Sequence, residues 1–141
     1  MKEIRSEIDI LASPEKVWEI LTDLEKYQEW NPFLHHASGM TELGGKVDVT
    51  FKYGSKDMTL HCTVTKNEAN AELRWRYHVG LPFLYQGEHI FVLEQRGTNL
   101  IHFTDKEVFT GLLIPFMVKE NDTGDFEAMD KALKARAEGT E

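Results

Sequence analysis

The chain has 141 residues, of which 41% are hydrophobic and 28% charged, and its formal net charge is −8. This length and composition suit one globular domain, residues 1–141, that buries a sizeable core of its own. Nucleic acids and anionic membrane surfaces both require a basic footprint, and the sequence has none, so neither is an expected partner. No run approaches the ~20 apolar residues of a membrane helix, so membrane insertion is not expected either.

The N-terminus and the cysteine content bear on location. The first ten residues, "MKEIRSEIDI", are charged and alternating, unlike a secretory signal. Cys62 is the only cysteine, so an intrachain disulfide is impossible. Both features favour a reduced, cytoplasmic protein, which we expect to be a monomer or a homodimer.

The first elements are a strand and two short helices. Alternation in "EIRSEIDILAS" predicts a strand with Ile4, Ser6, Ile8 and Ile10 on one face. The segment "SPEKVWEILTDL" then predicts a helix, capped by Ser13 and with a proline at its first helical position. A second short helix is expected from Asp23 to the "NP" pair at residues 31–32. The predicted buried positions of the two helices are Val17, Trp18, Leu21, Leu24, Tyr27 and Trp30.

Six alternating segments follow, separated by short turns, and predict an antiparallel meander with one face in water. They are "FLHHASGM", "KVDVTFKYG", "DMTLHCTVT", "ELRWRYHVG", "LPFLYQGEHIFVLE" and "NLIHFTDKEVFTG". One face of these strands is rich in aromatic residues, namely Phe51, Tyr53, Trp75, Tyr77, Phe83, Tyr85, Phe91, Phe103 and Phe109.

The C-terminal region, Pro115 to Glu138, has apolar residues at spacings of about three and four and predicts a long helix. Its apolar positions are Phe116, Met117, Phe126, Met129, Leu133 and Ala137. The segment "NDTG", residues 121–124, is poor helix sequence and predicts a kink or a place where something packs close to the backbone.

Four segments carry a resemblance to a known family: "ASPEKVWEILTDLEKYQEWNPF" from Ala12, "GEHIFVLE" from Gly87, "EVFTGLLIP" from Glu107 and "GDFEAMDKALKARAE" from Gly124. The chain resembles the START-like (SRPBCC) superfamily, and most closely its polyketide-cyclase-like branch. The resemblance implies an α+β helix-grip fold, in which a curved antiparallel sheet wraps around the long C-terminal helix. It also implies a cavity between sheet and helix for a small hydrophobic molecule.

The aromatic face agrees with such a cavity, although the same side chains could simply fill the core. We expect the ligand to contact Phe51, Tyr53, Trp75, Tyr77, Tyr85, Phe91, Phe103, Phe109, Phe126 and Met129. The weak helix at 121–124 and the loop "GLPF", residues 80–83, are expected to form mobile gates.

Two carboxylates interrupt this face, because Asp105 and Glu107 share the parity of Phe103 and Phe109. A hairpin centred near Gly97 would place His89 opposite Asp105, and Gly87 opposite Glu107 with space above the glycine. His89, Asp105 and Glu107 are therefore the candidate catalytic residues, since a His–carboxylate pair in an apolar cavity can bind a polar group or move a proton. The alternatives are that the carboxylates lie in water at the cavity mouth, or that Asp105 only satisfies a buried His89.

Neither a metal site nor a cofactor is expected, because no ligands have zinc-site spacing and no phosphate-binding loop occurs. The predicted function is binding of a small hydrophobic or aromatic ligand, such as a lipid or a polyketide-like molecule. One alternative is a cyclase or dehydratase that uses His89 and Asp105 as acid and base. Another is a partner-binding module, which would need an exposed apolar patch.

Overall fold

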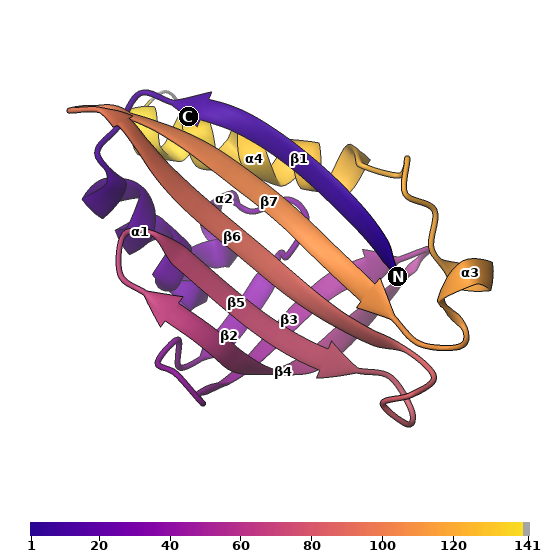
Figure 1. The fold of residues 1–141 in the computed structure, drawn as a ribbon. Helices are drawn as coiled ribbons and strands as arrows, with labels where there is room; N and C mark the ends of the chain where they lie inside the picture. The colour runs from indigo at the N-terminus through magenta and orange to yellow at the C-terminus, as the bar shows by residue number, and fades with distance from the viewer. Residues whose placement is uncertain (140–141) are drawn as a thin grey trace.

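The computed structural model describes residues 1–139, in which a seven-stranded antiparallel sheet curves around a C-terminal helix (Figure 1). The strands are β1 (Lys2–Ile10), β2 (His36–Gly39), β3 (Lys46–Tyr53), β4 (Lys56–Glu68), β5 (Glu72–His78), β6 (Gln86–Gly97) and β7 (Leu100–Thr110). The helices are α1 (Pro14–Thr22), the 3₁₀ turn η1 (Leu24–Lys26), α2 (Tyr27–Trp30), α3 (Ile114–Met117) and α4 (Gly124–Glu138). The strand order is β1-β7-β6-β5-β4-β3-β2, so β1 pairs with β7 and extends the meander from β2 to β7 at that edge. The predicted helix-grip fold is confirmed.

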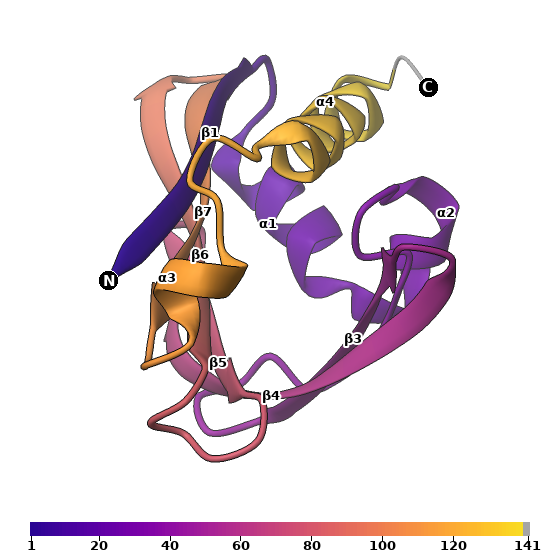
Figure 2. The ribbon, with the colours of Figure 1, turned by 90° about the vertical axis from the view of Figure 1, so that its right-hand side faces the viewer.

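α1, α2 and α4 lie on the concave side of the sheet, where α4 packs against β1 and α1 packs against α4 (Figure 2). α1 begins as predicted, because the Ser13 side chain accepts a hydrogen bond from the Lys16 amide. The side chain of Asn31, at the end of α2, accepts from the Phe33 and Leu34 amides and so turns the chain into β2. The largest fully buried side chains of the main core include Trp75, Tyr27, Phe91, Phe103, Met129 and Leu133.

The expectation of one helix from Pro115 to Glu138 is wrong, because residues 118–123 separate α3 from α4. These residues include Asn121 and Asp122, whose side chains compete with helical hydrogen bonds. The Lys2 ammonium instead donates to the Val118 carbonyl at 2.7 Å and ties the segment to β1. Phe116 is consequently 86% exposed, and Met117 is exposed as well, instead of lying on the buried stripe.

The strand expected from residue 81 begins only at Gln86. Residues 81–84 form a turn in which the Leu84 amide donates to the Leu81 carbonyl, and Pro82 has no amide to offer a sheet. Phe83 therefore lies in an exposed turn and does not belong to the aromatic inner face.

Candidate functional site: a buried polar network beside an apolar cavity

The inner face of β7 carries its two carboxylates inside the protein. Asp105 is completely buried and Glu107 is 8% exposed, and both lie between the buried side chains of Phe103 and Phe109. The alternative in which the carboxylates lie in water at the cavity mouth therefore does not hold.

The pairing of β6 with β7 differs from the predicted register by two residues. Glu107, not Asp105, lies opposite His89, and Asp105 lies opposite Phe91. The irregularity between Gln95 and Gly97 moves the centre of the turn toward the C-terminus, where Gly97 pairs with Leu100. A shift of two residues leaves each side chain on its predicted face, so the polar residues still meet.

His89 contacts both carboxylates, one through each ring nitrogen. Its Nε2 lies 2.6 Å from Asp105 Oδ1, and its Nδ1 lies 3.3 Å from Glu107 Oε1. The imidazole is 2% exposed and stacks on the Phe91 ring, with the ring centres 4.2 Å apart. The Phe91 ring thus fixes the orientation of the imidazole between the two carboxyl groups.

Glu107 receives a second partner from β5, since the Tyr77 hydroxyl donates to Glu107 Oε2 at 2.6 Å. Gly87 makes this contact possible, because a Cβ at that position would lie 2.5 Å from the Tyr77 hydroxyl oxygen. The space predicted above Gly87 is therefore filled by the Tyr77 ring.

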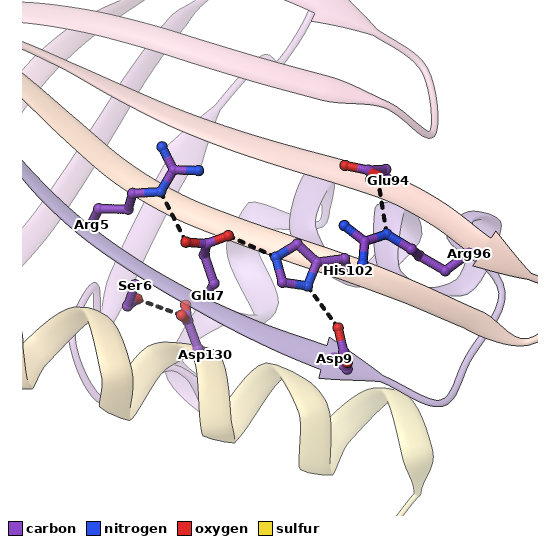
Figure 3. A network of polar contacts seen from close by, with 8 residues as sticks. All are labelled: Arg5, Ser6, Glu7, Asp9, Glu94, Arg96, His102 and Asp130. Atoms are coloured by element: carbon purple, nitrogen blue, oxygen red, sulfur yellow. Dashed lines mark hydrogen bonds and ion pairs between the residues drawn. The ribbon is translucent and has the colours of Figure 1, made fainter.

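Asp130, which was not predicted from the sequence, extends the cluster on the other side of Asp105. Asp130 lies in α4 with 1% exposure, and its Oδ2 accepts a 2.5 Å hydrogen bond from the Ser6 hydroxyl of β1. Figure 3 shows this contact between β1 and α4, on the opposite side of β1 from the exposed contacts of Glu7 and His102. The carboxyl groups of Asp130 and Asp105 interact with each other, and each shifts the pKa of the other.

The six residues form one connected set, which we call the buried network: Ser6, Asp130, Asp105, His89, Glu107 and Tyr77. A signal for Asp130 was present in the sequence. It is a single carboxylate within the buried stripe of α4, four residues after Phe126 and three before Leu133.

Burial dominates the acid–base behaviour of the network, since low-dielectric surroundings disfavour every charged form. It raises the pKa of Asp105 to about 8 and that of Asp130 to about 9. It also raises the pKa of Glu107, which the Tyr77 hydrogen bond opposes, and lowers the pKa of His89. The Asp105–Asp130 pair therefore keeps at least one proton at neutral pH.

A cavity of about 340 Å³ lies beside the network. Seven of the predicted ligand-contacting residues line it: Phe51, Tyr53, Trp75, Tyr77, Tyr85, Phe109 and Phe126. Phe91, Phe103 and Met129 do not line it but pack in the core. Among the candidate catalytic residues, His89 and Glu107 reach the cavity wall, whereas Asp105 lies behind them. Phe33, which the sequence analysis did not select, also lines the cavity and lies 5.1 Å from Phe126, ring centre to ring centre.

Met117 at the end of α3 and the segment between α3 and α4 form one side of the cavity, the segment through Val118, Lys119 and Asp122. The loop at 80–83 does not line it, although Val79 just before the loop does. An exposed apolar patch lies nearby, since the Leu112 amide bonds to the Phe83 carbonyl and brings two apolar loops together. Its exposed members are Leu81, Phe83, Leu112, Leu113 and Phe116.

Within residues 1–139, no group of three histidine, cysteine or acidic side chains is arranged to hold a metal ion. No helix among these residues is long and apolar enough to cross a membrane.

A curved antiparallel sheet, a helix gripped on its concave side and an aromatic cavity between them define a helix-grip protein. The chain belongs to the polyketide cyclase/dehydrase and lipid transport family, whose sequence profile matches residues 1–138. No curated protein matches the sequence significantly.

Solved structures share the fold over the whole chain. A START superfamily protein from Mycobacterium smegmatis has a TM-score of 0.78 at 15% identity, with 100% of both chains covered. Protein MLL2253 from Mesorhizobium loti has a TM-score of 0.77 at 17% identity, with 99% of both chains covered. Norcoclaurine synthase from Thalictrum flavum, in complex with dopamine and hydroxybenzaldehyde, has a TM-score of 0.73 at 13% identity, covering 99% of this chain and 88% of that one. At these identities the likeness concerns the fold alone.

Proposed function

We propose that the protein binds a small, largely apolar aromatic molecule in the cavity and orients it through one polar group. The observation that carries this proposal is the distribution of chemistry around the 340 Å³ space. Aromatic and aliphatic side chains form most of the wall. Tyr77, His89 and Glu107 form its buried polar part, and the other charged residues that line the cavity are exposed: Lys52, Lys119, Asp122 and Asp125. Apolar walls with a few convergent polar groups are typical of small-molecule sites.

At the polar end of the cavity, one contact is long enough that a polar group of the ligand can form a hydrogen bond there. The His89–Glu107 contact, at 3.3 Å, is longer than the 2.6 Å contacts that each residue makes elsewhere. A ligand hydroxyl or amine that donates to Glu107 or accepts from His89 adds a bond without disturbing the shorter ones. Hydrogen bonds that involve charged groups contribute about 1.5–3 kcal/mol each, enough to fix the orientation of an aromatic ligand.

The test is a fluorescence titration with 1-aminoanthracene, a tricyclic aromatic amine. The variant Leu60→Trp places a larger side chain on the cavity wall, and the matched control Leu43→Trp adds the same side chain to an exposed turn. We expect Leu60→Trp to weaken binding at least tenfold and Leu43→Trp to leave it unchanged. Equal affinities in all three proteins would place the probe outside the cavity and contradict the proposal.

A second function, proton transfer on a cavity-bound substrate, is favoured by one observation. His89 and Glu107 face the same space, and burial shifts their pKa values toward each other, down for His89 and up for Glu107. Such a pair suits general acid–base catalysis near neutral pH. Asp105 then positions His89 from behind and does not contact the substrate. Deuterium exchange at C1 of 2-tetralone, a bicyclic aromatic ketone, tests this function: it should be faster than in buffer with the native protein and return to the buffer rate in Glu107→Gln.

A further inference from the structure

The buried network reaches from the ligand cavity to a second cavity, which lies between β1 and α4. Its inner end, Tyr77 with His89 and Glu107, lies on the wall of the 340 Å³ cavity. Its outer end, Ser6 with Asp130, lies in a separate crevice of about 290 Å³ between β1 and α4. The ligand cavity is thus joined to this crevice by a series of polar contacts between buried side chains.

Each intermediate residue of this series contacts its outer neighbour through one atom and its inner neighbour through a different atom. Asp130 bonds to Ser6 through Oδ2, and Asp105 bonds to His89 through Oδ1. The other carboxyl oxygens, Oδ1 of Asp130 and Oδ2 of Asp105, are buried and have no hydrogen-bond partner among the other residues, so they are the atoms left for the interaction between the two acids. His89 then contacts Asp105 through Nε2 and Glu107 through Nδ1. A purely structural pair of buried acids does not require this alternation, whereas stepwise proton movement does.

We propose that Ser6, Asp130 and Asp105 form a proton path that connects His89 and Glu107 of the ligand cavity with the outer crevice between β1 and α4. This inference goes beyond the proposed ligand binding and does not depend on it. It assigns to Asp130 and Ser6 a role in setting the charge of the cavity wall from the far side of the protein.

Proton transfer along the path balances when every donor hydrogen points toward the ligand cavity. Asp130 Oδ1–H then donates to Asp105 Oδ2, Asp105 Oδ1–H donates to His89 Nε2, and His89 Nδ1–H donates to Glu107 Oε1. A proton added to Asp130 Oδ2 from the crevice, past the Ser6 hydroxyl, moves each of these protons one bond inward. Asp130, Asp105 and His89 each gain one proton and lose one, while Glu107 becomes protonated. Only O–H and N–H bonds form and break, and the reverse sequence carries a proton out.

Other titratable or charged groups lie around the path on the elements packed against it. They are Tyr27 of α2, Cys62 of β4, Tyr85 before β6, Arg5 and Glu7 of β1, and Glu127 and Lys131 of α4. Within residues 1–139, no ion pair joins a lysine or arginine to Asp105, Glu107 or Asp130. A fixed cation would hold one carboxylate permanently ionised, so the absence of such a pair leaves the acids of the path free to exchange protons.

The test measures how fast the ring protons of His89 exchange with water, by NMR of protein that contains ¹⁵N-labelled histidine. Asp130→Asn keeps the shape of the side chain, but its amide does not release a proton near neutral pH. We expect exchange to slow at least tenfold in Asp130→Asn and also to slow in Ser6→Ala. The matched control is Glu127→Gln, an exposed carboxylate of the same helix and crevice, and it should exchange like the native protein.

The signal of the His89 ring proton also reports the exchange. A signal that is broad in the native protein, because it exchanges fast, and narrow in Asp130→Asn supports the path as well. Equal exchange in the native protein and Asp130→Asn, or a signal absent from both, would overturn the path, because protons would then reach His89 from the cavity or through local opening. Backbone amide exchange at Phe91 and Phe103 serves as the control and should stay unchanged in the variants in which His89 exchange slows. If these amides slow by the same factor, the variants have changed local opening of the protein, and the inference is overturned as well. If Asp130→Asn does not fold, Ser6→Ala decides alone.

Discussion

Replacing Asp130 with asparagine should change how the stability of the protein depends on pH. Burial raises the folded-state pKa of Asp130 to about 9, from an ordinary value near 4. The folded protein therefore holds a proton that the unfolded chain releases above about pH 4. A group whose pKa is raised on folding contributes stability that is fully present below its unfolded pKa and is lost as pH rises through its folded pKa. Asparagine at position 130 carries no such proton.

The size of the effect follows from linkage. Each proton held only by the folded state lowers the free energy of unfolding by about 1.4 kcal/mol per pH unit. Between pH 5 and pH 7 the native protein should thus lose about 3 kcal/mol more than Asp130→Asn does. Other groups, such as His89 and Glu107, titrate in both proteins, so their effects largely cancel in the difference.

The assay is urea unfolding followed by circular dichroism at pH 5, 6, 7 and 8, with the free energy extrapolated linearly to water. Glu127→Gln is the control, since this exposed carboxylate should give a curve parallel to that of the native protein. Parallel curves for Asp130→Asn and the native protein would show that Asp130 is ionised in the folded state, and would contradict its raised pKa.

Four further results are expected. Tyr77→Phe removes the partner of a buried carboxyl group and should lower the free energy of unfolding by about 1–3 kcal/mol in urea titrations, and an unchanged midpoint would argue against the Tyr77–Glu107 bond. Gly87→Ala places a Cβ against the Tyr77 ring and should cost about 1–3 kcal/mol in the same assay; the double variant Gly87→Ala, Tyr77→Ala should recover part of that loss, and strict additivity would speak against the close contact. Burial raises the pKa of Cys62 to about 12, so 5,5′-dithiobis(2-nitrobenzoate) at pH 8 should label the thiol only after denaturation, and rapid labelling of the native protein would contradict its burial. Backbone amides of residues 119–122 should exchange with deuterium at least tenfold faster than those of Met129 to Leu133, and equal protection would exclude this segment as a gate.

The alternation of the strands predicted much of the site, because a side-chain period of two fixes which face each residue occupies. The inward direction of Asp105 and Glu107 follows from their parity with Phe103, and the same argument places Trp75 and Tyr77 inside. The contact of His89 with Asp105 was predicted although the register was wrong, since a shift of two residues preserves the face.

Long-range packing decided what the sequence pattern could not. Asp130 meets Asp105 because α4 lies along β1, and no local period encodes that placement. The break between α3 and α4 at residues 118–123 depends on contacts that take the place of helical hydrogen bonds. One of them is the bond from Lys2 to the Val118 carbonyl, between residues more than 100 positions apart in the sequence. Neither the depth of the cavity nor the exclusion of Phe91 and Phe103 from its wall follows from parity, because both depend on how strongly the sheet curves.

The most direct test of ligand binding is to map 1-aminoanthracene on the protein by NMR chemical-shift changes in the native chain. We predict that the largest changes occur at cavity-lining residues on separate strands and on α4, including Phe51, Trp75, His89 and Phe126. Changes confined to the exposed apolar patch around Phe83, Leu112 and Phe116 would contradict the account, because the probe would then bind a surface and not the space beside the buried network.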